Sequence, residues 1–229
     1  MDLFEHLFEP EELLPELQPY LTEAMGMPMI QHPLVYSMFH NPVMNRMVNM
    51  QYLTKRHQCE QALVDHDYGQ YVFLHEKPYR VWALCHCHQL KADSRYLWWK
   101  LLGQVWADSE NVWQNKSFWN QELSDPDPQK IFLMAVDGQQ AFNQLEYPLQ
   151  VFRGAQPHNK RGLSWTTNKD KAQWFATRLK PKNPLLLSAT VTKGQAIAMF
   201  TGRGESEVVL SPKTVRKLRF TEFALPTRV

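Results

Sequence analysis

The order of hydrophobic patterns along the chain is the feature that most limits its fold. From Ser94 to Trp106, apolar residues recur at helical spacing, which predicts a helix capped by Asp93 or Ser94. After Pro148 the pattern changes to short runs that are typical of strands. The expected strands cover residues 149–153, 162–166, 185–191, 195–200 and 207–210, with 215–223 as a further candidate. Helices followed by strands favour an α+β fold.

Other helices are expected on both sides of this change. One covers about Asn41–Val64 and is followed by a turn at Asp67–Gly69. Another begins at Asp127–Pro128, a capping residue followed by proline, and continues to about Leu145. A short helix is expected over residues 170–179. The prolines in residues 1–23 limit that segment to short helical turns.

Charge is distributed unevenly over the 229 residues, although the net charge is only +2. Residues 1–147 hold 10 Lys and Arg against 19 Asp and Glu, a balance of −9. Residues 148–229 hold 15 against 4, a balance of +11. A basic half suits a polyanionic ligand such as a dinucleotide or a nucleic acid. The alternative is that the two oppositely charged halves face each other.

Cysteine content and hydropathy indicate the compartment. Three cysteines do not make a disulfide framework and favour a reducing environment. No run approaches the roughly 20 apolar residues that a membrane span needs. The acidic N-terminus differs from a secretory signal or a transit peptide. We therefore expect a cytoplasmic protein without membrane partners, in the producing cell or in a host cell.

The run Cys85-His86-Cys87-His88 resembles a metal-binding tract. Structural zinc sites usually take ligands from pairs that are separated by two to four residues. Adjacent ligands splay around a helix or alternate across a strand, so few of them can converge on one ion. The sequence therefore predicts no metal, and the apolar residues Val81, Trp82 and Leu84 favour a buried helix instead.

Three short motifs follow one another in the second half of the chain. They are Val151-Phe152-Arg153-Gly154, Gly162-Leu163-Ser164-Trp165-Thr166, and Gly204-Glu205-Ser206-Glu207. Each is common alone, but their order and their expected strand contexts are informative together. The pattern resembles the arginine, Ser-x-Thr and Glu-x-Glu motifs of the mono-ADP-ribosyltransferases, over about residues 129–223. It is most similar to compact phage and bacterial members.

The resemblance implies a site for NAD⁺, and the residue types suit its chemistry. Cleavage of the nicotinamide–ribose bond passes through an oxocarbenium-like transition state. Arg153 would clamp the pyrophosphate, because a guanidinium is bidentate and always charged. The alternative for Arg153 is a surface salt bridge. Gly154 would let its backbone approach the nicotinamide amide.

The remaining motif residues are expected to face one cleft. Ser164 and Thr166 lie two apart on a strand, so both hydroxyls point to the same side and Trp165 to the core. Glu205 and Glu207 share this spacing if their segment is extended. By resemblance, Glu207 binds the ribose and stabilises the oxocarbenium, while Glu205 orients the acceptor. The alternatives are ordinary strand residues and a solvated charged turn.

The resulting hypothesis has two regions. Residues 1–125 would form a helical region that selects the target or supports the core. Residues 126–229 would form a small ADP-ribosyltransferase-type β core with flanking helices. The expected reaction transfers ADP-ribose from NAD⁺ to an arginine of a target protein and releases nicotinamide. The alternatives are an NAD⁺ glycohydrolase and a non-catalytic basic module that binds a partner protein or nucleic acid; nucleic acid is also the less favoured acceptor.

Overall fold

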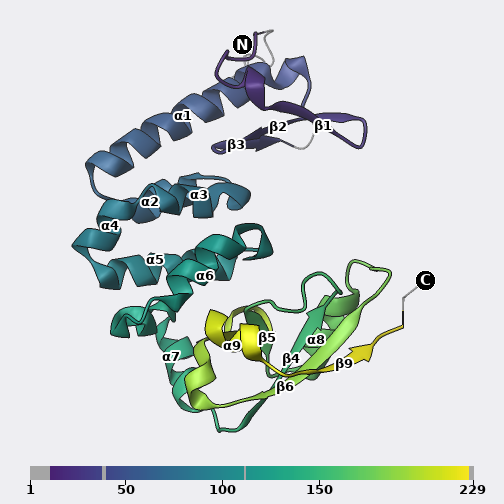
Figure 1. Cartoon of the computed structure of the whole chain (residues 1–229). Coiled ribbons are helices and arrows are strands. Elements are labelled where there is room, and N and C mark those ends of the chain that lie inside the picture. Colours follow the sequence, from purple (N-terminus) through teal and green to yellow (C-terminus); the bar gives the residue numbers. More distant parts are fainter. Residues whose placement is uncertain (1–10, 38–39, 111, 227–229) are drawn as a thin grey trace. The chain divides into compact units, whose positions relative to one another are not determined.

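The computed structural model describes residues 11–37, 40–110 and 112–226. The chain divides into two compact units, Met1–Asp93 and Ser94–Val229, which we describe separately (Figure 1). We expected a division at residue 125. Instead, the helices from Ser94 onward are in the same unit as the C-terminal sheet. Both helices and antiparallel sheets are present, which confirms the α+β class.

A small antiparallel sheet lies near the start of the first unit. A 3₁₀ turn at Gln18–Tyr20 agrees with the helical turns expected over residues 1–23, but the last residues of that segment belong to the first strand. The strands of this sheet are β1 (Leu21–Ala24), β2 (Met27–His32) and β3 (Val35–Ser37), paired in that order. Met25 and Gly26 join β1 to β2, and both have left-handed φ angles, 54° and 75°. Such a pair forms the two-residue turn that matches the twist of a hairpin. Residues 1–10 of the expected helical segment lie outside the described residues.

The rest of the first unit is helical, as the sequence predicts. Its helices are α1 (Asn45–Val64), α2 (Tyr68–Leu74), α3 (Arg80–Cys85) and α4 (His88–Asp93). The end of α1 agrees with the expected helix to Val64, and a 3₁₀ turn at Pro42–Met44 precedes it. The expected turn at Asp67–Gly69 is wrong, because Asp67 accepts a hydrogen bond from the Gln70 amide and caps α2.

Helices also open the second unit. They are α5 (Arg95–Asp108) and α6 (Lys116–Ser124), with α7 (Val136–Asn143), α8 (Lys169–Thr177) and α9 (Pro212–Lys217) further along. The Ser94 hydroxyl accepts from the Leu97 amide and caps α5, as expected. The expected continuous helix after Asp127 is wrong. A 3₁₀ helix at Pro128–Leu133 ends in extended backbone at Met134, and α7 begins afterwards.

The sheet of the second unit carries the sequence motifs (Figure 1). Its described strands lie in the order β7-β8-β5-β4-β6-β9, and neighbouring strands are antiparallel. Their bounds are β4 (Leu149–Ala155), β5 (Ser164–Thr166), β6 (Leu185–Val191), β7 (Ala196–Phe200), β8 (Glu207–Leu210) and β9 (Thr221–Ala224). The expected strand over 215–223 is wrong in its first half. Ser211 accepts from the Thr214 amide and starts α9 with Pro212 in its first turn.

Tryptophan side chains form much of the core between α5, α6 and the sheet. Trp99 and Trp119 are completely buried, and Trp106 is 2% exposed. Gly103 brings α5 against the 3₁₀ helix, since a Cβ there would overlap the Leu133 backbone. The helices of the second unit thus contribute directly to its core. Within the described residues, no helix combines the length and apolar character that crossing a bilayer requires.

Candidate functional site

The site begins where β4 and β5 separate. These strands share a single register pair, Phe152 with Thr166. Beyond that pair the Arg153 side chain bridges the gap: its Nη1 donates to the Ser164 carbonyl oxygen at 2.6 Å and its Nη2 to that of Asn159 at 3.3 Å. A Cβ on Gly162 would overlap the guanidinium, so this glycine is what lets the side chain lie there. Arg153 therefore holds the 159–164 loop in place.

The Arg153 guanidinium retains binding capacity. It has five N–H donors, of which two are used by the carbonyl oxygens. Its Nε is buried and has no hydrogen-bond partner among the described residues. Burial lowers the pKa of Arg153 to about 10, and the charge of Glu207 opposes that shift. The alternative of a surface salt bridge does not fit a guanidinium that is enclosed and bonded to backbone carbonyls.

Glu207 is the first residue of β8, where two donors hold its carboxylate. The indole Nε1 of Trp106 lies 3.3 Å from each carboxylate oxygen, and the Ser164 side chain also bonds this group. Burial raises the pKa of Glu207, the bonds from Ser164 and Trp106 lower it, and the Glu205 charge raises it. Arg153 adds a smaller lowering effect. The structure thus brings Arg153, Ser164 and Glu207 together, as the motifs predict.

Thr166 and Trp165 have structural contacts. The Thr166 hydroxyl donates to the Glu205 carbonyl oxygen at 2.6 Å and accepts from the Asn168 amide at 3.0 Å. Trp165 is buried, as expected, and donates from Nε1 to the Gly162 carbonyl oxygen. Thr166 therefore ties β5 to the loop that carries Glu205, while Ser164 is the hydroxyl that reaches Glu207.

The segment around Glu205 is not extended, so the expected geometry of the two glutamates is wrong. Glu205 has helical backbone angles, and Ser206 has a left-handed φ of 43°. A left-handed serine is strained by about 1–2 kcal/mol. The two carboxylates still influence each other, because Glu205 raises the pKa of Glu207. A kinked loop, rather than a shared strand face, places Glu205 near Glu207.

Gly154 has a packing role that the sequence did not indicate. A Cβ at this position would overlap the Ala172 carbonyl oxygen and the Ala176 backbone of α8. The missing side chain therefore lets α8 lie directly against β4. This close helix contact explains the glycine without a ligand, whereas we had expected a close approach to nicotinamide.

Gly154→Ala is expected to destabilise the second unit by about 1–3 kcal/mol, because the added methyl group overpacks the β4–α8 contact. The measurement is the urea unfolding midpoint followed by circular dichroism. Gly194→Ala is the matched control, since a Cβ at Gly194 meets no atom within 4 Å. Equal midpoints for the two variants would show that α8 can move away at little cost.

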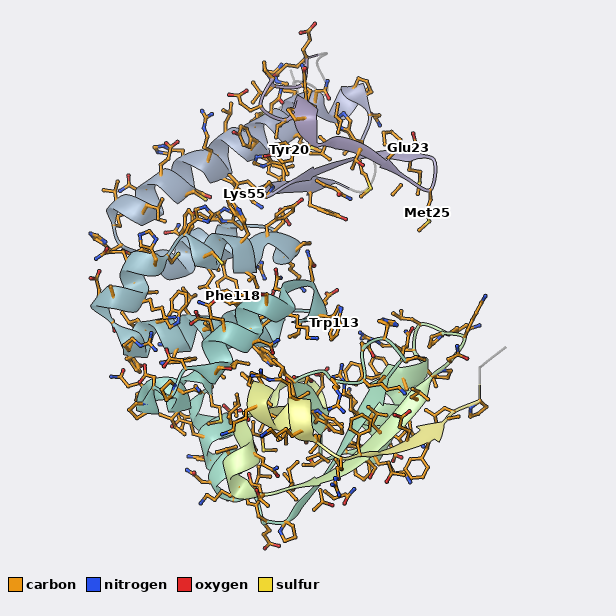
Figure 2. All side chains as sticks on the ribbon, viewed as in Figure 1. Tyr20, Glu23, Met25, Lys55, Trp113 and Phe118 are labelled. Atoms are coloured by element: carbon orange, nitrogen blue, oxygen red, sulfur yellow. The ribbon has the colours of Figure 1, made fainter. Side chains whose placement is uncertain are left out.

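Two adjoining cavities lie beside these residues. The inner one, about 40 Å³, is lined by Arg153, Ser164 and Gly162 together with Trp113, Lys116, Arg161, Val112 and Leu163. The outer one, about 390 Å³, shares Trp113, Lys116 and Arg161 with it and adds His158, Lys160, Glu222, Phe220 and Pro157. Trp113, labelled in Figure 2, lies in the short 3₁₀ turn before α6, and the Lys116 ammonium is 4.0 Å from its ring centre. This pair borders both cavities.

The lining of the inner cavity is strongly cationic. Lys116, Arg153 and Arg161 line it, whereas no lining residue is acidic. Glu207 is not a lining residue and connects to the cavity through Ser164. Typical ligand pockets enclose about 300–1,000 Å³. The inner cavity alone is smaller than that range, and the outer cavity is within it.

Sequence reasoning missed Trp106, Trp113, Lys116 and Arg161. The sequence places the expected site within residues 126–229, but three of these four residues precede residue 126. A buried indole N–H needs an acceptor, which is the one signal that pointed beyond simple packing for Trp106. The sequence contains no clue that the acceptor is Glu207, 101 positions away.

The Cys85–His88 tract lies in the first unit and is not one continuous helix. Cys85 ends α3 and is exposed, while Cys87 is buried, and burial raises its pKa to about 12. His86 bonds the Trp82 carbonyl oxygen through Nδ1 at 2.9 Å. The described residues contain no group of three or more His, Cys, Asp or Glu side chains arranged to hold a metal ion.

Comparison with known proteins gave no relative from which to assign these residues. No protein-family model matches the chain, and searches of curated proteins and of solved structures also returned no match.

Proposed function

We propose that the second unit is an NAD⁺-dependent ADP-ribosyltransferase that modifies an arginine side chain of a target protein. The observation that carries the proposal is the Glu207 carboxylate. It is held by Trp106 and Ser164, and Ser164 lines the same cavity as Arg153. A fixed carboxylate beside a cationic pocket suits a substrate that has a diphosphate and develops positive charge at a sugar carbon.

The cations around the inner cavity support binding of the diphosphate. Arg153, Lys116 and Arg161 line one space. Guanidinium groups bind phosphate oxygens in pairs of parallel hydrogen bonds. No lining residue is acidic, so the side chains of the cavity wall favour an anion.

A dinucleotide needs more room than the inner cavity has. The outer cavity supplies it, because it shares Trp113, Lys116 and Arg161 with the inner one. We infer that the Trp113 and Lys116 side chains move when NAD⁺ binds and join the two spaces. Trp113 is 40% exposed, so its displacement does not disrupt the core.

The reaction requires a carboxylate in its charged form. The bond between the nicotinamide nitrogen and the ribose C1′ breaks, and its electron pair leaves with nicotinamide, which becomes neutral. Positive charge then develops on the ribose, and the Glu207 carboxylate stabilises it. A nitrogen of the acceptor guanidinium bonds to C1′ and transfers a proton to the Glu205 carboxylate. Burial raises the pKa of Glu207. When the pH is lowered, activity should therefore be lost at a higher pH than an ordinary glutamate would give.

Glu205 supports an arginine acceptor over water. An arginine side chain is a poor nucleophile until a carboxylate shares or takes its proton. Glu205 is near enough to Glu207 to raise the pKa of that group, so a second carboxylate is available beside the reacting sugar. Water needs no such orientation. The glycohydrolase reaction would use the same NAD⁺ site and is distinguished only by its product.

The test is to incubate the protein with NAD⁺ and a cell lysate and to measure two products. We expect nicotinamide release together with ADP-ribose on arginine, located by mass spectrometry. Arg153→Ala is expected to reduce both products by at least tenfold, because a charged hydrogen-bond donor to phosphate is lost. Arg178→Ala is the control, since this exposed arginine lies over Trp174 on α8.

Each other outcome is informative. Nicotinamide release without modified protein would identify a glycohydrolase. An inactive wild-type chain that unfolds cooperatively would contradict both enzymatic functions. Equal activity of the two arginine variants would remove Arg153 from the site.

A further inference from the structure

A helix outside the three motifs contacts the proposed catalytic carboxylate. The Nε1 of Trp106 lies 3.3 Å from both oxygens of Glu207, so one N–H is shared between them. Trp106 belongs to α5, and Glu207 to β8. Ser164 is the other donor to this carboxylate and comes from β5. Two donors from different elements therefore fix the position of one charged group.

The Trp106 indole is itself held rigidly. It is 2% exposed and meets the Trp119 ring edge-on, with ring centres 4.9 Å apart and planes at 84°. On another side it lies nearly parallel to Phe200, with ring centres 6.4 Å apart. Phe200 is the register partner of Glu207 in the β7–β8 pair. The same strand pair thus positions both the carboxylate and a ring against which its donor packs.

We propose that Trp106 is a positioning residue for Glu207 and that α5 is therefore part of the active site. The inference rests on the proposed function for its catalytic meaning. The contact itself does not depend on that function: the Trp106 N–H stabilises the charged form of Glu207 and restricts its rotamer. A donor that bonds a carboxylate favours ionisation, whereas burial disfavours it. Trp106 opposes the effect of burial on Glu207.

The experiment replaces Trp106 by phenylalanine, which keeps an aromatic ring but removes the N–H. We expect Trp106→Phe to raise the pKa of Glu207 and to reduce nicotinamide release near neutral pH by roughly tenfold. The acid limb of the pH–rate profile should move to higher pH. A merely structural role would lower the amount of folded protein without moving that limb.

Trp99→Phe is the matched control. Trp99 is on the same helix, is completely buried, and donates from Nε1 to the Asp127 carboxylate at 2.9 Å. Its replacement removes the same kind of bond from the same helix, but at a carboxylate outside the site. We expect Trp99→Phe to lower the stability of the unit and to leave the pH–rate profile unchanged.

A second measurement does not depend on activity. The Glu207 carboxyl carbon is followed by NMR in protein labelled at glutamate, with Glu207→Gln used to assign its signal. Its titration should move to higher pH in Trp106→Phe and remain in place in Trp99→Phe. If phenylalanine at position 106 prevents folding, benzothienylalanine there keeps the shape of tryptophan without an N–H.

The outcomes separate the inference from the proposed function. An unchanged Glu207 titration in the position-106 variants, or an equal change in Trp99→Phe, would overturn the positioning role. A shifted titration in a chain that releases no nicotinamide would support the role of Trp106 and contradict the enzymatic proposal.

Discussion

Glu207→Gln is expected to lower nicotinamide release by roughly 10²–10³-fold, the largest effect of any single change considered. Removal of one preorganised electrostatic contact to a developing charge typically has this effect. Glutamine keeps the size of the side chain, and its amide oxygen can still accept from Trp106 and Ser164. The fold should therefore be retained, so that the loss reports on charge. The measurement is kcat for nicotinamide release, alongside the urea unfolding midpoint.

Glu205→Gln is the informative comparison. It removes a carboxylate near Glu207 but not the one that Trp106 and Ser164 hold. We expect arginine modification to be lost while much of the NAD⁺ hydrolysis remains, since water does not need the second carboxylate. If both activities fall by the same factor, Glu205 acts in the NAD⁺ step, and the arginine assignment loses its main support.

A fragment of residues 126–229 is expected not to fold, whereas residues 94–229 should unfold cooperatively. The shorter fragment lacks α5 and α6, which bury Trp98, Trp99, Trp106 and Trp119. Burial of one large apolar side chain contributes about 1.5–3 kcal/mol. Four of them together contribute roughly as much as the whole stability of a typical domain, about 5–15 kcal/mol. The measurement is urea unfolding of both fragments by circular dichroism.

Specific contacts cross the boundary that we expected at residue 125. Trp99 donates to Asp127, and Gly103 lies against the Leu133 backbone, so the cut separates groups that touch. It also leaves Glu207 with one of its two donors removed. A cooperative transition for 126–229 with native-like circular dichroism would contradict this account and restore the boundary expected from sequence.

Local patterns predicted much of the sheet that carries the site. The bounds of β6 and β8 agree with the expected strands, because short apolar runs between turn residues are a clear signal for a strand. The order of Arg153, Ser164 and Glu207 also predicted that these residues come together. Their actual partners were not predictable, because hydrogen bonds between distant segments depend on the packed structure.

The errors have two kinds of cause. The helix expected after Asp127 is interrupted at Met134, whose sulfur lies 3.1 Å from the Met199 amide of β7, so a tertiary contact overrides local propensity. The strand expected over 215–223 overlooked a local signal. Ser211 and Pro212 form a helix start, and both residues were readable in the sequence.

Gly162 limits which substitutions this site can accept in evolution or design. Any side chain at position 162 would overlap the Arg153 guanidinium and displace its charge. The two positions are therefore constrained as a pair: arginine at 153 requires glycine at 162. The position of the cation can therefore be changed by a substitution nine positions away in sequence, in the loop that leads into β5. Gly162→Ala would keep every ionisable group of the site and still change the electric field there, because the Arg153 charge would move.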